Sequence, residues 1–306
     1  MALLNFKRKN TAAPTSPEVE TFLQDFSIEV MPRTAQKVEN FRDLLPAETR
    51  VYIAHIEGTP IEEMVATAKR LHDDGFKVMP HFPARIIKDQ ATLADWISRY
   101  QGEADVKQGL LLAGGVTAPL GDFDSSMQLM ETGLFDKAGF ERLHFAGHPE
   151  GNRDIDPDGS QSNVTAALRW KNDFQMRTDV KMALATQFAF DAEPIISWVD
   201  TLAEQGITLP VHIGIAGPAK LQTLIKFAIA CGVGPSLKVL QKRAMDVTKL
   251  LLPYEPTDVV TRLAAHKAQN PDFNITNVHF FPLGGIKTNA AWARENGGAA
   301  AQSANA

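Results

Sequence analysis

The sequence predicts an α/β fold, a single (β/α)₈ TIM barrel with extra helices before its last strand. Three observations predict it: short apolar runs alternate with amphipathic segments, there are eight such runs, and the mean spacing of about 32–36 residues per strand-and-helix unit suits a barrel of roughly 250 residues. The runs, each a predicted strand, occupy residues 26–31, 50–56, 77–82, 109–113, 142–147, 181–188, 210–215 and 278–283.

The segments between the runs have helical spacing. In residues 61–74 the apolar side chains Met64, Ala68 and Leu71 recur every three or four positions, with charged residues between them. Residues 192–205 repeat this pattern and end before a glycine, which is typical of a helix end. Residues 235–270 carry two further helical stretches, so this interval is predicted to be an insertion before the eighth strand.

The two ends of the chain are predicted to be tails around one domain. Residues 1–20 and 295–306 are rich in small and polar residues, and the second segment is expected to be disordered. The catalytic barrel is therefore expected to occupy residues 21–294.

A doubly wound sheet is the rival fold, and it predicts a glycine-rich phosphate turn after the first strand. The first run is followed by residues 32–35, Pro-Arg-Thr-Ala, which include no glycine. The pair Gly114-Gly115 after the fourth run is too short to supply that signal. These observations favour the barrel.

The composition limits the class of protein. The 306 residues are 44% hydrophobic and 22% charged, which excludes disordered and collagen-like classes. The net charge of −5 argues against a nucleic-acid partner, and the lone cysteine, Cys231, allows neither an internal disulfide nor a cysteine-based zinc site. No stretch reaches the roughly 20 apolar residues that span a bilayer, and residues 1–10 lack a secretory pattern. A cytoplasmic protein without a membrane partner is expected.

Polar residues at strand ends are candidate site residues, because a barrel enzyme builds its active site there. Glu29 lies inside an apolar run, and alternation places it on one face with Ser27. An inward carboxylate is costly unless it is paired or protonated, and desolvation would raise its pKa, which suits a general acid. A salt bridge to Arg33 or Arg50 is the structural alternative.

Three histidines also follow predicted strands. His55, His81 and His148 could contact a ligand or simply hydrogen-bond within the protein, and the absence of a His-x-His spacing predicts no metal site. Gln187 offers an amide that both donates and accepts, which suits a planar heterocycle as well as a core position. The glycine-containing turn 214–217 could leave N–H groups free for a phosphate or simply be a tight turn.

Six short motifs follow one another on the predicted strands, over about residues 25–290. They are SIEVMPRT (27–34), PHF (80–82), HPEG (148–151), TQFAFD (186–191), GI (214–215) and VHFFPL (278–283). In this order the sequence resembles the methylenetetrahydrofolate reductase family, flavin-dependent (β/α)₈ barrels of one-carbon metabolism. The glutamate motif and the TQFAFD motif are the specific ones.

The resemblance implies a role for each matching position. Glu29 corresponds to the general acid that protonates the folate, so that its five-membered ring opens to the reactive iminium. Gln187 corresponds to the residue that hydrogen-bonds the pterin, and Phe190 and Leu221 are further substrate-binding positions. The cofactor-binding positions implied by the resemblance are His55, His81, Ala113, Gly114, Gly115, His148, Asn152 and, on looser spacing, Lys171.

Several of these positions depart from the family pattern. The family's fourth strand ends in Leu-Arg-Gly-Asp, whereas residues 112–115 read Leu-Ala-Gly-Gly, so two charges that touch the flavin are absent. Leu221 replaces an aromatic residue, His148 a tyrosine and Asn152 a histidine. A loss of full charges changes the electrostatics of a flavin pocket. The departures imply that FAD is held differently or weakly, or that the nicotinamide passes its hydride directly to the folate iminium.

The expected function is an oxidoreductase that interconverts 5,10-methylenetetrahydrofolate and 5-methyltetrahydrofolate using NAD(P)H, through FAD or by direct hydride transfer. A tetrahydrofolate derivative is the expected partner, and association into a homo-oligomer is a further expectation. Two alternatives stay open: a methyltetrahydrofolate-binding methyltransferase barrel, and a non-catalytic folate- or flavin-binding protein.

Overall fold

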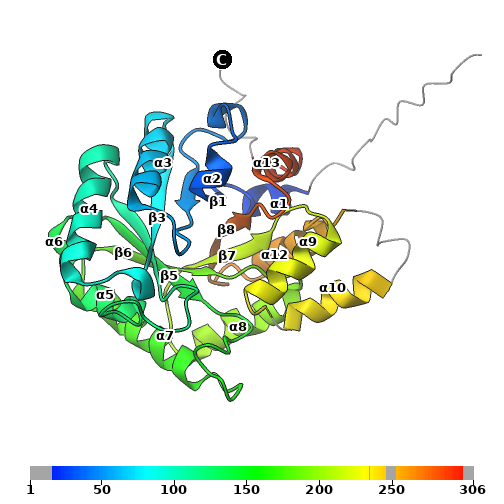
Figure 1. Cartoon of the computed structure of the whole chain (residues 1–306). Helices are drawn as coiled ribbons and strands as arrows, with labels where there is room; N and C mark the ends of the chain where they lie inside the picture. The colour runs from blue at the N-terminus through cyan, green and yellow to red at the C-terminus, as the bar shows by residue number, and fades with distance from the viewer. Residues whose placement is uncertain (1–15, 234, 246–252, 299–306) are drawn as a thin grey trace, which may run out of the picture.

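The computed structural model describes residues 16–233, 235–245 and 253–298, in which eight parallel strands close a barrel in chain order (Figure 1). The strands are β1 (Ser27–Val30), β2 (Arg50–Ile53), β3 (Lys77–Pro83), β4 (Gln108–Leu112), β5 (Arg142–Gly147), β6 (Lys181–Thr186), β7 (Val211–Ala216) and β8 (Ile275–Phe281). Each predicted run overlaps a strand, so the predicted (β/α)₈ barrel is confirmed. β8 begins before the predicted run, because its first part contains the polar residues Thr276 and Asn277 and so is not an apolar run.

Side chains along each strand alternate between the barrel interior and the outer surface of the sheet. Register pairs align Glu29 of β1 with Tyr52 of β2, and Tyr52 with Met79 of β3. Tyr52, Met79, Leu110 and Ala185 form a small cluster inside the barrel, separate from the main hydrophobic core between strands and helices. Every second strand residue is therefore available to shape the interior.

Helices cover the outside of the sheet (Figure 1). They are α1 (Pro17–Phe22), α2 (Pro32–Ala35), α3 (Ile61–Asp73), α4 (Gln90–Ala104), α5 (Ser126–Glu131), α6 (Leu134–Lys137), α7 (Ser162–Phe174), α8 (Ala192–Glu204), α9 (Leu221–Ala230), α10 (Pro235–Met245), α12 (Thr257–Gln269) and α13 (Ile286–Glu295), with the 3₁₀ helices η1 (Phe41–Asp43), η2 (Ala84–Ile86) and η3 (Gln175–Arg177).

Local sequence sets the ends of these helices. α4 begins where the Asp89 side chain accepts a hydrogen bond from the Thr92 backbone N–H at 2.8 Å, which satisfies a free donor of the first turn. α3 ends just before Gly75, whose φ of +87° is a backbone conformation that glycine adopts without strain. The predicted apolar stripe of α3 is buried against the sheet.

The predicted insertion before the eighth strand contains α10 and α12, as the helical spacing indicated. At the amino end, α1 begins at Pro17, within the segment predicted to be a tail, and it buries Val19 and Phe22. Ordered structure therefore starts before residue 21. Residues 1–15 and 299–306 of the predicted tails lie outside the described residues.

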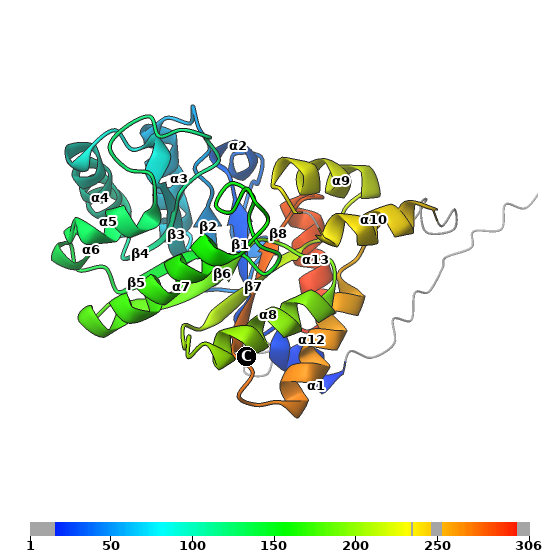
Figure 2. The same cartoon turned by 90° about the horizontal axis from the view of Figure 1, so that it is seen from below.

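The carboxyl ends of the strands form one end of the barrel, which we call the mouth. In Figure 2 the barrel is seen from the side, with α2, α9 and α10 toward this end and α1 at the opposite end. None of the helices in the described ranges is both long and apolar enough to cross a membrane.

Candidate functional site

Glu29 points into the barrel near the mouth and meets two histidines from other strands. Its Oε2 lies 3.3 Å from Nε2 of His81 on β3 and 3.9 Å from Nε2 of His279 on β8. The Glu29 side chain is 19% exposed, so a ligand in the mouth can reach it. Its partners in the described structure are thus imidazoles, and not the arginines Arg33 or Arg50 that the sequence alternative named.

The two imidazoles determine the ionisation of Glu29. Burial acts to raise the pKa of Glu29, but the interactions with His279 and His81 outweigh it and lower the pKa to about 2. The expectation of a raised pKa is therefore wrong, because alternation could not show which groups face the carboxylate. Near neutral pH Glu29 is an ionised hydrogen-bond acceptor, and it can donate a proton only after receiving one.

A line of polar side chains runs from the mouth into the barrel interior. Ser27 Oγ and His279 Nδ1 are hydrogen-bonded at 2.9 Å. The Tyr52 ring lies 4.2 Å from that of His279, and its hydroxyl is hydrogen-bonded to Nδ1 of His144 at 2.5 Å. The His144 ring in turn lies 4.3 Å from the ring of His212 on β7. Burial lowers the pKa of both His144 and His212, so these rings are neutral near pH 7.

Gln187 directly follows β6 and is half-buried at the mouth. Its Oε1 accepts a hydrogen bond from the Phe188 backbone N–H at 3.1 Å. Within the described part of the chain its amide nitrogen has no hydrogen-bond partner, so the donor half of the amide is left for a ligand. The amide oxygen, which the sequence suggested as an acceptor for a ligand, already accepts the hydrogen bond from Phe188.

Phe190 and Leu221 belong to a second hydrophobic cluster beside β7, and each is 4% exposed. The Phe190 ring packs edge-on against Tyr254 at 5.5 Å. These two positions therefore build the wall behind the mouth and offer little open surface to a ligand.

His55 follows β2 and packs against α4. Its ring is 4.8 Å from that of Trp96, and its Nε2 is hydrogen-bonded to the Thr59 carbonyl at 3.0 Å. Burial is the main reason that the pKa of His55 is lowered. The structure thus places this histidine between the sheet and a helix.

The loop after β4 carries Ala113 and Gly114, which are half-buried, and Gly115, which is exposed. The Ala113 carbonyl accepts a hydrogen bond from the Arg85 backbone N–H at 2.9 Å. At Gly114, φ is +107° and an added Cβ would lie 3.1 Å from the Pro83 side chain. The turn therefore needs glycine at this position, and it brings uncharged backbone to the mouth.

His148 and Asn152 lie in the loop after β5, where Asn152 Nδ2 is 3.5 Å from His148 Nδ1. Burial, followed by the charge of Lys171, lowers the pKa of His148 to about 4. Lys171 itself is 6% exposed on α7, with its ammonium 5.6 Å from the centre of the Phe145 ring, and burial lowers its pKa to about 8. His148 is therefore neutral near pH 7, and the Lys171 ammonium is buried between α7 and the Phe145 ring.

Arg85 connects two loops of the mouth. Its Nε donates to Asp124 Oδ1 at 2.8 Å and its Nη1 donates to Asp154 Oδ2 at 2.7 Å, while Nη1 also donates to the Val116 carbonyl at 3.1 Å. The guanidinium is 11% exposed in both ion pairs. Arg85 thus fixes the loop after β4 relative to the loop after β5.

Segment 214–217, which the sequence predicted to be a turn, begins inside β7 and does not leave its glycine N–H groups free for a phosphate. The Gly214 N–H donates to Thr186 Oγ1 at 2.8 Å, and the Gly217 N–H donates to the Phe281 carbonyl at 2.9 Å. An added Cβ at Gly217 would come within 1.7 Å of Asn289 Oδ1. These glycines permit close packing of chain segments.

Sequence reasoning missed several residues of this site. His144 and His212 carried no proposed role, Arg85 was not singled out, and His279 appeared only within a motif. Alternation along β5, β7 and β8 could have placed the three histidines inside the barrel, since each lies among apolar strand neighbours. Among the described residues, no group of three or more His, Cys, Asp or Glu is arranged to hold a metal ion.

No model of a known protein family matches the chain. Among solved structures it is similar to an uncharacterized Clostridium thermocellum protein that binds two copies of 5-methyl-5,6,7,8-tetrahydrofolic acid, with a TM-score of 0.54 and 11% identity over 89% of this chain and 95% of that one. It is also matched to 7,8-dihydropteroate synthase from Vibrio fischeri ES114, with a TM-score of 0.43 and 9% identity over 89% and 92% of the two chains. The first likeness supports the barrel fold.

Proposed function

We propose that this chain binds a reduced folate at the mouth, with the Glu29 carboxylate accepting hydrogen bonds from the pterin. The observation that carries the proposal is the placement of Glu29, an ionised carboxylate that lies inside the barrel, stays 19% exposed and has two imidazole nitrogens within 4.0 Å. A pterin presents a ring N–H and an amino group side by side, and a carboxylate can accept from both. The amide nitrogen of Gln187 adds a donor for the pterin carbonyl.

The similar Clostridium thermocellum barrel supports a methylated reduced folate as the ligand class, because that protein binds 5-methyltetrahydrofolic acid and matches this chain over most of both lengths. The motifs that resemble the methylenetetrahydrofolate reductase family support the same class.

Two reactions are open to a folate held in this way. In the first, 5,10-methylenetetrahydrofolate takes up a proton and opens to the iminium, and NAD(P)H then delivers a hydride to the methylene carbon, which gives 5-methyltetrahydrofolate and NAD(P)⁺. Glu29 would hold the proton at the start of this reaction, and the neighbouring groups are His81 and His279.

FAD was the first expected carrier of that hydride, and the residues present do not fit it well. Ala113, Gly114 and Gly115 are uncharged, His148 is neutral, and the Lys171 ammonium is buried under α7. This set presents no accessible counter-charge to the FAD pyrophosphate, which carries two negative charges. We therefore propose the reductase reaction in its direct form, with the hydride passing from the nicotinamide to the folate.

In the alternative, the chain binds 5-methyltetrahydrofolate. It then either transfers the methyl group to an acceptor or binds the folate without any reaction. Two observations favour this alternative. Glu29 is ionised in the free protein, which suits pterin binding without proton donation, and the solved barrel reported above binds the methylated folate.

Calorimetric titration with 5-methyltetrahydrofolate tests the shared proposal. Wild-type protein should bind it and Glu29→Gln should bind it at least about tenfold more weakly, since one charge-assisted hydrogen bond contributes about 1.5–3 kcal/mol. Glu62→Gln removes a carboxylate from the exposed surface of α3 and serves as the matched control. Equal affinity of wild type and Glu29→Gln would contradict the proposal.

An anaerobic absorbance assay then separates the two reactions. NADH is mixed with the protein and 5,10-methylenetetrahydrofolate, with and without added FAD. Loss of the NADH band without FAD supports direct reduction, and loss only with FAD would contradict the direct form. If NADH persists in both mixtures while 5-methyltetrahydrofolate binds, the methyl-folate alternative is supported.

A further inference from the structure

Four positive side chains gather at the end of the barrel opposite the mouth. Arg50, Lys77, Arg142 and Lys181 are the first residues of β2, β3, β5 and β6, and we call them the cationic floor. Register pairs place Arg50 beside Lys77 and Arg142 beside Lys181. Gln108 of β4 joins the two halves, because its Oε1 accepts a hydrogen bond from Arg50 Nε at 2.8 Å and its backbone is in register with Arg142.

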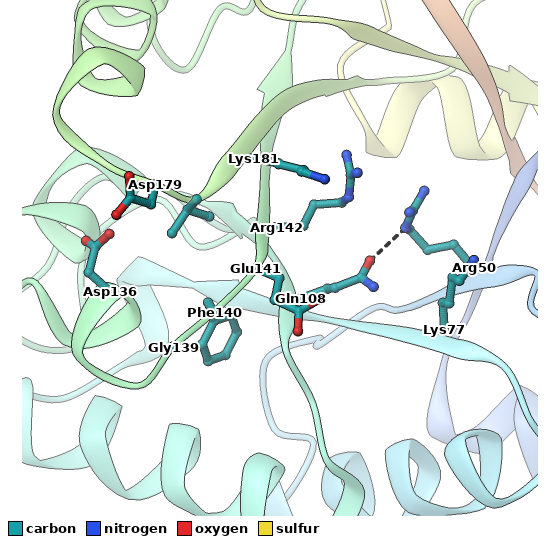
Figure 3. Close-up of a pocket in the computed structure, with 11 residues that line it drawn as sticks. Arg50, Lys77, Gln108, Asp136, Gly139, Phe140, Glu141, Arg142, Asp179 and Lys181 are labelled. Carbon is teal, nitrogen blue, oxygen red and sulfur yellow. Dashed lines mark hydrogen bonds between the residues drawn. The ribbon is translucent and has the colours of Figure 1, made fainter.

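Two adjoining cavities open at the cationic floor. Their volumes are about 680 and 650 Å³, and Arg50, Lys77 and Arg142 line both. Figure 3 shows the side chains of Arg142 and Lys181 in the larger cavity, with Asp136 and Asp179 away from them on its other side. Cavities of this size suit a small metabolite.

The positive charges at the floor are incompletely paired. Lys77 Nζ lies 3.3 Å from Glu48 Oε2. Within the described ranges, however, no carboxylate lies within 4.0 Å of the side-chain nitrogens of Arg50, Arg142 or Lys181. Burial is the largest effect on the pKa of Arg50 and lowers it; the charge of Arg142 acts in the same direction, whereas Tyr52 and Asp25 act in the opposite one. Four like charges therefore lie together, and among the described residues only Lys77 has a carboxylate within 4.0 Å. Further carboxylates line the two cavities at greater distance, namely Asp136, Glu141 and Asp179 in one and Glu20 and Asp25 in the other.

A buried imidazole faces the same space and provides an independent observation. His212 lines the smaller cavity and is 3% exposed, and in the part of the chain that the structure describes its Nδ1 has no hydrogen-bond partner. A neutral imidazole can carry its proton on Nδ1 and donate it to an oxygen atom. An imidazole nitrogen without a partner, beside cations that are only partly paired, is an arrangement that an oxyanion would satisfy.

We propose that the cationic floor is a binding site for a phosphate-bearing small molecule. Two guanidinium groups supply paired N–H donors whose geometry matches phosphate oxygens, and two ammonium groups add positive charge. The bound phosphate neutralises charges that otherwise repel one another. This site lies at the far end of the barrel from Glu29, and it does not depend on the folate proposal.

Thermal unfolding measures this binding. Inorganic phosphate, pyrophosphate and glycerol 3-phosphate are each compared with sodium chloride at equal ionic strength. At a tenfold excess over the dissociation constant, a bound phosphate should raise Tm by about 2–5 °C. Arg142→Gln and Lys181→Gln should lose this rise, whereas Lys69→Gln, which removes a charge from the exposed surface of α3, should keep it. Lys181 is exposed, so its substitution leaves the fold intact even if Arg142→Gln does not fold.

A second measurement reports on the site itself. Nuclear magnetic resonance of histidine-labelled protein should show the pKa of His212 rising when phosphate binds, because a nearby anion stabilises the imidazolium. A response to inorganic phosphate alone identifies the free ion as the ligand, and a stronger response to the ester identifies a phosphorylated metabolite. An equal effect of chloride and phosphate on Tm, or a phosphate response that persists in Lys181→Gln, would overturn the proposal.

Discussion

Nε2 of His81 lies 3.3 Å from Oε2 of Glu29, although their strands, β3 and β1, are separated by β2. The contact crosses the barrel interior and fixes the carboxylate in a position that the mouth leaves partly open. His279 approaches the same oxygen from β8. Ionisation of Glu29 and its availability to a ligand are thus set by the closure of the barrel.

The pH dependence of stability should report this pairing. The folded pKa of Glu29 is about 2 against an ordinary value of 4.5, so Glu29 should contribute about 3 kcal/mol at pH 7. Because the folded pKa is the lower one, this contribution is present above about pH 4.5 and is lost as the pH falls toward 2. Urea unfolding at pH 7, 4 and 3 should show the difference between wild type and Glu29→Gln shrinking; a constant difference would contradict the pairing.

The buried histidines should give a second, separate pH dependence. Burial lowers the pKa of His144 and His212 in the folded state, so the unfolded chain binds more protons below about pH 6.5 and stability should fall as the pH drops from 7 to 5.5. His212→Gln should reduce this slope by up to about 1.4 kcal/mol per pH unit. An unchanged slope in His212→Gln would contradict this assignment.

Two buried tyrosines make a matched pair for testing the interior hydrogen bond. The Tyr52 hydroxyl is bonded to His144, whereas the Tyr100 hydroxyl has no partner among the described residues, and both side chains are fully buried. Tyr52→Phe should lower the free energy of unfolding by about 1–3 kcal/mol, because it leaves an imidazole nitrogen unpaired. Tyr100→Phe should be neutral or stabilising. The opposite order in urea unfolding would show that the Tyr52 contact contributes little.

Loss of the Arg85 guanidinium should loosen the mouth. Arg85→Gln removes two ion pairs and hydrogen bonds to two backbone carbonyls, and we expect a loss of about 1–3 kcal/mol together with faster proteolysis of residues 113–125 and 150–160. The control is Arg99→Gln, which breaks an exposed ion pair with Glu62 and should cost less than about 1 kcal/mol. Equal effects of the two substitutions would mean that Arg85 does not order the loops.

The strands and the barrel could be predicted from the sequence, because periodicity and spacing are local properties. Alternation also identified Glu29 as an inward carboxylate. It could not show that His279 and His81 face it, since Glu29 meets His279 across 250 positions of sequence and His81 across 52. The sign of the pKa shift depended on that long-range contact, so it was predicted wrongly.

The position of a residue at a strand end did not determine which way its side chain faces. His55 and His81 both lie near the carboxyl ends of their strands, yet one packs on Trp96 outside the sheet and the other reaches Glu29. Arg85 lies beyond a strand end in η2, where no pattern of apolar residues marks it. Its two carboxylate partners come from loops, whose paths the sequence does not specify.

β7 pairs with β8 at six positions. In contrast, β6 pairs with β7 at two positions, and β8 pairs with β1 at two positions. β7 and β8 therefore form a unit with few backbone hydrogen bonds to the rest of the barrel. Partial separation of β7 from β6 and of β8 from β1 should require less free energy than global unfolding. Amide hydrogen exchange in these two strand pairs should be correspondingly faster. Because His279 lies on β8, the same fluctuation would intermittently free the Glu29 carboxylate from one of its imidazoles and admit water beside it.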